Sequence, residues 1–89
     1  MDETKFRSAA KKAVVEYWNG NKTLTKKFGE IKAASVYFVW QVKVLQNNKA
    51  LLGVKVEDDG MYFEFTYNGD DQKAYLDVYK MQTSRMIDI

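Results

Sequence analysis

The sequence predicts an α+β fold, in which an N-terminal amphipathic helix packs on one face of a four-stranded antiparallel meander sheet. Apolar residues recur at helical spacing over residues 2–19, and from residue 36 onward they alternate with a period of two. Short turn motifs separate the alternating segments, and strands joined by short turns are antiparallel neighbours. Because the chain has 89 residues, we expect a single domain over residues 1–89.

The helix is expected over residues 2–19. Asp2 is the predicted N-cap, Glu3 favours the positive end of the helix dipole, and Gly20 is suited to end the helix. Trp18 flanks the predicted buried face. That face has i, i+4, i+7, i+8, i+11 spacing and consists of Phe6, Ala10, Ala13, Val14 and Tyr17.

Residues 21–35 have the weakest hydrophobic periodicity of the chain. Leu24, Phe28 and Ile31 recur at about helical spacing, but this stretch also contains threonines and a glycine, which disfavour a helix. We expect a loop with one helical turn here. For residues 82–89 three alternatives stay open: an extension of the last strand, a short turn or a frayed end.

Four segments predict strands, and three polar or glycine-containing segments predict the turns between them. The strands are expected over residues 36–45, 51–57, 61–67 and 73–81, with turns at 46–49, 58–60 and 68–71. Alternation assigns one apolar set to the face that the helix covers. That set is Val36, Phe38, Trp40, Val42, Val44, Leu52, Val54, Val56, Met61, Phe63, Phe65, Ala74, Leu76 and Val78.

The opposite face of the predicted sheet is the candidate surface for a protein partner. Tyrosine combines a large contact area with a polar tip, which suits interfaces. The same tyrosines could instead pack across strands and stabilise a single-layer sheet. The candidate partner-binding residues are Tyr37, Val39, Gln41, Lys43, Tyr62, Tyr75 and Tyr79.

The charges are unevenly distributed along the chain. Residues 1–49 carry ten Lys or Arg and four acidic residues. Residues 50–89 carry four Lys or Arg and eight acidic residues. A basic half favours contact with phosphates, so nucleic-acid binding is the second hypothesis. It is less favoured than protein binding, because exposed lysines are ordinary on a helix. The residues it would use are Lys11, Lys12, Lys22, Lys26 and Lys27.

The residue types exclude most site chemistries. Without His and Cys there is no Ser-His-Asp triad, no cysteine nucleophile and no thiolate or imidazole metal site. The acidic pairs Asp58–Asp59 and Asp70–Asp71 fall on successive turns, roughly 20 Å apart, whereas paired catalytic carboxylates need about 5–10 Å. We therefore expect no enzyme activity, no cofactor and no metal.

We also expect no membrane partner and a cytoplasmic location. The longest apolar run, residues 36–40, is too short to cross a bilayer. The N-terminal residues are polar and lack the pattern of a signal peptide.

Several segments resemble an uncharacterised family of short phage and prophage proteins from Gram-positive bacteria. The resemblance rests on VYFVW at 36–40, LQNNKAL at 45–51, DGMY at 59–62, TYNGD at 66–70 and YLDVYK at 75–80, together with KKAVV at 11–15. It implies expression in a bacterial host and no established activity. The sequence predicts a non-enzymatic module that binds a host or phage protein. A role in counter-defence or host takeover fits the provenance that the resemblance implies, and no residue specifies that role. A homodimeric structural protein remains an alternative.

Overall fold

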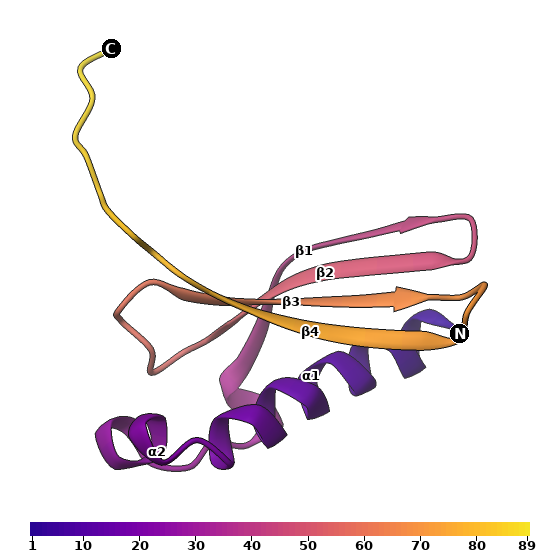
Figure 1. Cartoon of the computed structure of the whole chain (residues 1–89), viewed down its shortest axis with the longest axis horizontal. Coiled ribbons are helices and arrows are strands. Elements are labelled where there is room, and N and C mark those ends of the chain that lie inside the picture. Colours follow the sequence, from indigo (N-terminus) through magenta and orange to yellow (C-terminus); the bar gives the residue numbers. More distant parts are fainter.

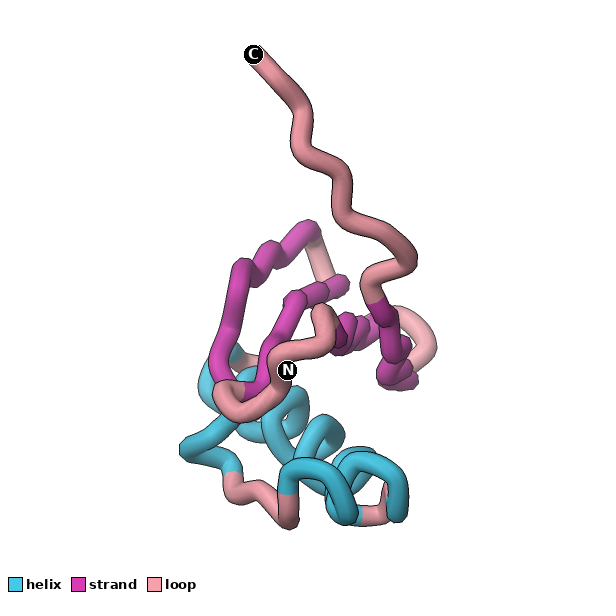
Figure 2. Tube along the Cα trace, turned by 90° about the vertical axis from the view of Figure 1, so that its left-hand side faces the viewer, coloured by secondary structure: helices cyan, strands magenta, loops and turns pink.

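The computed structural model describes all 89 residues and confirms the α+β fold with a four-stranded antiparallel open sheet. Both helices lie on one side of the strands (Figures 1 and 2). The sheet order is β1-β2-β3-β4, so each strand pairs with its neighbour in the chain. In chain order the elements are α1 (Glu3–Asn19), α2 (Lys22–Phe28), the 3-10 turn η1 (Ala33–Ser35), β1 (Val36–Val44), β2 (Asn47–Val54), β3 (Met61–Asn68) and β4 (Lys73–Lys80).

Helix α1 begins as its sequence predicts. The Asp2 side chain accepts a hydrogen bond of 2.8 Å from the Lys5 backbone N–H, which satisfies one of the free donors of the first turn. Gly20 follows the last helical residue. The N-cap and the end of the helix are thus local properties of the sequence.

The buried stripe of α1 differs from the predicted one at its C-terminal end. Trp18 is fully buried, whereas Tyr17 is 37% exposed. The reason is α2, which covers the side of α1 that carries Trp18. The Trp18 ring lies 5.5 Å from the Phe28 ring, and its indole N–H donates to the Gly29 carbonyl at 3.0 Å.

The prediction of a loop with one turn over residues 21–35 was wrong in extent. Residues 22–28 form α2, and residues 33–35 form η1. The Asn21 side chain caps α2 by accepting from the N–H groups of Thr23 and Leu24. The Thr25 hydroxyl bonds back to the Asn21 carbonyl at 3.1 Å, so this threonine is accommodated by a local hydrogen bond.

A β-bulge at Val39 overturns part of the predicted alternation. Phe38 pairs with Leu52 and Trp40 pairs with Leu51, which leaves Val39 without a partner on β2. One extra residue exchanges the two faces of the strand beyond it. Trp40, Val42 and Val44 were predicted to face the helix and are instead 42%, 47% and 60% exposed.

The strand ends also differ from the predicted ones. Strand β2 begins at Asn47 and ends at Val54, so the turn before it shrinks to Leu45 and Gln46, and Val56 is 47% exposed rather than inward. Strand β4 ends at Lys80. Residues 81–89 form no helix or strand and lead away from the sheet (Figure 1).

The core lies between α1 and the first three strands. It contains Phe6, Ala10, Val14, Trp18, Leu24, Ile31, Val36, Ala50, Leu52, Val54, Phe63 and Phe65. The helices leave strand β4 largely uncovered. Val78, on the helix-side face of β4, is accordingly 37% exposed. The opposite face of the whole sheet has no covering layer.

Candidate functional site

The uncovered face of the sheet, here called the outer face, gathers large exposed side chains from three strands. Four of the residues proposed from the sequence lie on it: Tyr37, Tyr62, Tyr75 and Tyr79. The bulge adds three that the sequence analysis assigned to the core: Trp40, Val42 and Val44. All seven are at least 40% exposed.

The other three candidates lie elsewhere. Val39 is the bulge residue itself, and it is 46% exposed. Gln41 and Lys43 lie on the helix side of β1, where the Gln41 amide oxygen accepts a 2.7 Å hydrogen bond from Arg7. A mismatch in the sequence could have indicated this exchange of faces. The first two turns of α1 carry Glu3 and Arg7, which are poor neighbours for Trp40 and Val42.

One end of the outer face is an aromatic row. Tyr62 on β3 lies directly opposite Tyr79 on β4, and Tyr37 lies opposite Gly53. The Tyr37 ring covers Gly53 so closely that a Cβ atom added there would lie 2.4 Å from the ring. An aromatic side chain over a strand glycine stabilises the pairing of the two strands.

The middle of the outer face is acidic. Glu64 on β3 and Asp77 on β4 are direct cross-strand neighbours, an arrangement that destabilises a sheet when both are charged. Lys49 on β2 compensates in part, with its ammonium 3.5 Å from Glu64. The next pair along these strands is Thr66 and Tyr75. Two carboxylates therefore lie between aromatic side chains.

The lysines proposed for nucleic-acid binding are spread over two helices, and two of them form ion pairs within the chain. Lys12 pairs with Glu16 at 3.9 Å, and Lys27 pairs with Asp59 in the turn after β2. The Lys27 hydrogen bond lowers the pKa of the Asp59 carboxyl, and the same bond raises the pKa of Lys27. Lys11 lies 5.9 Å from the Phe38 ring centre. Lys22 and Lys26 belong to α2.

No group of three or more carboxylates comes together in a way that could hold a metal ion. Neither helix combines the length and the apolar character needed to cross a lipid bilayer.

The fold and its outer face define a small α+β protein with a one-sided sheet whose free face is aromatic with an acidic centre. Residues 7–89 match a family of unknown function, DUF6275, and the chain belongs to that family. No curated protein and no solved structure matches the chain.

Proposed function

We propose that the chain is a non-enzymatic protein-binding module of phage or prophage origin that acts in the cytoplasm of a bacterial host. The observation that carries the proposal is the outer face. It exposes four tyrosines, one tryptophan and two valines on a single side of the sheet. Aromatic residues dominate the energetics of protein interfaces because they bury a large area with few rotatable bonds. A role in counter-defence or host takeover fits this origin.

The acidic centre of the outer face favours a partner with an exposed basic residue. Glu64 and Asp77 are cross-strand neighbours and Lys49 pairs only with Glu64, so a Lys or Arg of the partner placed beside Asp77 would balance the second carboxylate. The neighbouring tyrosines add cation–π attraction for the same basic group. We therefore propose that the partner surface is apolar with a central cation. A nucleic-acid backbone, being anionic, fits this face poorly.

The direct test is a selection of peptides on the folded, full-length chain. We expect the selected peptides to combine aliphatic or aromatic residues with a central Lys or Arg. The variant Tyr75→Ala/Tyr79→Ala should lose binding to them about a hundredfold, since two interface aromatics are removed. The variant Glu64→Gln/Asp77→Asn should lose the preference for a basic residue and keep the apolar one.

Matched controls come from the helix side of the molecule. Glu3→Gln and Glu16→Gln remove the same number of carboxylates from α1 and should leave peptide binding unchanged. The proposal is overturned if the Tyr75/Tyr79 variant binds as well as the unaltered chain, or if salt-dependent nucleic-acid binding through Lys22 and Lys26 is the only interaction found. Light scattering over a range of concentrations tests the alternative of a homodimer formed through the same face.

A further inference from the structure

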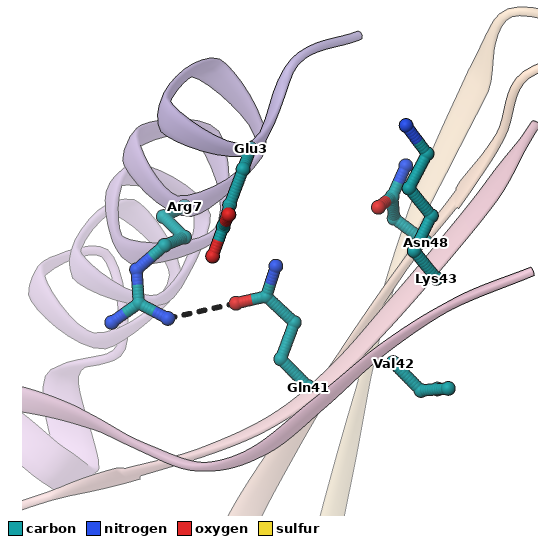
Figure 3. Close-up of a pocket in the computed structure, with 6 residues that line it drawn as sticks. All are labelled: Glu3, Arg7, Gln41, Val42, Lys43 and Asn48. Atoms are coloured by element: carbon teal, nitrogen blue, oxygen red, sulfur yellow. Dashed lines mark hydrogen bonds between the residues drawn. The ribbon is translucent and has the colours of Figure 1, made fainter.

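The N-terminal half of α1 and the strands β1 and β2 border a polar cavity of about 330 Å³ on the helix side of the sheet, and this cavity is open to solvent. Figure 3 shows Glu3 and Arg7 reaching it from α1, and Gln41, Lys43 and Asn48 reaching it from the strands. The Val42 side chain points away from it. The cavity volume falls near the lower end of the range for small-molecule sites, roughly 300–1,000 Å³.

Asn48 is the most informative residue in this cavity. The residue is only 3% exposed, and its side-chain amide nitrogen has no hydrogen-bond partner within the protein. A buried donor without an acceptor destabilises a fold. The nitrogen itself has almost no accessible surface, so an acceptor atom bound in the cavity would supply the missing partner once the Asn48 amide turns toward it. Asn48 is thus an observation that points to a ligand independently of the charges around it.

Neither cation of the cavity is paired with a carboxylate, and Arg7 is also held in place by its neighbours. The three ion pairs of the chain include neither Arg7 nor Lys43. The Arg7 guanidinium lies 3.8 Å from the Phe38 ring centre and donates to the Gln41 amide oxygen. These contacts fix its orientation and leave its positive charge without a carboxylate partner.

We infer that this cavity binds a small polar molecule through an oxyanion, either a carboxylate or a phosphate group. Arg7 and Lys43 supply the positive charge, and the Asn48 amide supplies a buried donor. The Gln41 amide nitrogen is a further donor, because its oxygen is already engaged by Arg7. Glu3 is the one carboxylate in the lining, so a ligand with a single negative charge fits best.

The Val39 bulge is what builds the site. Without it, Gln41 and Lys43 would face the outer side, and Trp40 and Val42 would lie beneath α1. Bulges occur next to functional sites because they redirect side chains. The site lies on the opposite side of the sheet from the proposed protein-binding face, so each can be tested without the other.

The test uses the isotopically labelled full-length chain and its side-chain amide NMR signals. Inorganic phosphate and acetate are titrated separately at constant ionic strength. We expect saturable shifts of the Asn48 and Gln41 amide signals. Saturation with phosphate alone identifies a phosphate ligand, saturation with acetate alone identifies a carboxylate ligand, and saturation with both supports recognition of the shared oxyanion.

Two variants and one control separate a binding site from a structural feature. Lys43→Gln should weaken binding about tenfold, because a charge-assisted contact is lost. Asn48→Leu should abolish binding, yet leave the midpoint of urea unfolding equal or higher, since it removes a buried donor without a partner. Lys55→Gln, at the other end of the sheet, should change neither measurement.

The inference is overturned if neither anion gives saturable shifts, or if Lys55→Gln weakens binding as much as Lys43→Gln does. A lowered unfolding midpoint for Asn48→Leu, together with unchanged anion affinity of Lys43→Gln, would assign Asn48 a structural role only.

Discussion

At the scale of single residues, Val39 has the largest effect on what this protein presents to its surroundings. It has no partner on β2, and every side chain of β1 after it lies on the face opposite to the one that strict alternation predicts. Trp40 is moved to the outer face and Gln41 to the helix side. The polar cavity and the Trp40, Val42 and Val44 part of the outer face therefore depend on this one residue.

The contact between Tyr37 and Gly53 leads to a prediction at the same scale. In Gly53→Ala the new methyl group would lie 2.4 Å from the Tyr37 ring, so the ring must move off the neighbouring strand. We expect a loss of about 1 kcal/mol in the free energy of unfolding. Urea denaturation measures this loss.

The control for that prediction is a double-mutant cycle. In a Tyr37→Ala background the Gly53→Ala substitution meets no ring, and alanine is favoured over glycine within a strand by about 0.5–1 kcal/mol. The second substitution should then be neutral or stabilising. Equal costs of Gly53→Ala in both backgrounds would show that the ring does not pack on Gly53.

At the scale of elements, α2 shows why a short helix is hard to predict. Seven residues are too few to form a stable helix alone, so packing must stabilise them.

Two hydrogen bonds join the end of α1 to the segment after α2, so that α2 is held between two points fixed to each other. The Asn19 side chain accepts from the Ile31 N–H at 2.9 Å and donates to the Ile31 carbonyl at 3.0 Å.

We expect Asn19→Ala to destabilise the protein by about 2 kcal/mol, because it removes two partly buried hydrogen bonds of about 1 kcal/mol each. Asn19→Asp keeps the acceptor for the Ile31 N–H and loses the donor, so its cost should be smaller. Urea unfolding gives both values, and hydrogen exchange at the Ile31 amide should be faster in Asn19→Ala. An exchange rate equal to that of the unaltered chain would contradict this assignment.

At the scale of the whole molecule, the ion pair between Lys27 and Asp59 links the helical layer to the turn between β2 and β3. Because the pKa of Asp59 is lowered from its ordinary value of 3.8, the unfolded chain takes up a proton more readily than the folded one. The stabilisation is complete above that ordinary value and is lost as pH falls through the lowered one. The pKa of Lys27 is raised, so its contribution is lost only in strongly basic solution.

The expected outcome concerns Asp59→Asn. Its urea midpoint should lie below that of the unaltered chain at pH 7, and the difference should shrink as the pH falls below the ordinary pKa of Asp59, 3.8. Lys27→Gln should follow the same trend. Asp70→Asn, whose carboxylate has no ion-pair partner, should show no such convergence. A difference that is constant over this range would exclude the pair as its source.

Most of the fold could be predicted because it depends on local periodicity. The helical stripe from Phe6 to Val14, the Asp2 cap and the alternation in β3 each follow from residues close together in the chain. The burial of Trp18 could not be predicted, because it requires α2 to pack beside it. The exposure of Trp40 could not be predicted from the residues of β1 alone, because a bulge leaves the alternation of residue types unchanged.

The sequence by itself determined the fold class, the order of the strands and the tyrosines available on one face, since short turns and periods of 3.6 and two are local properties. Only the tertiary structure decided which side of the sheet receives Trp40, Gln41 and Lys43. That choice depends on the register between β1 and β2 and on what α1 can cover, and both are contacts between residues distant in the chain.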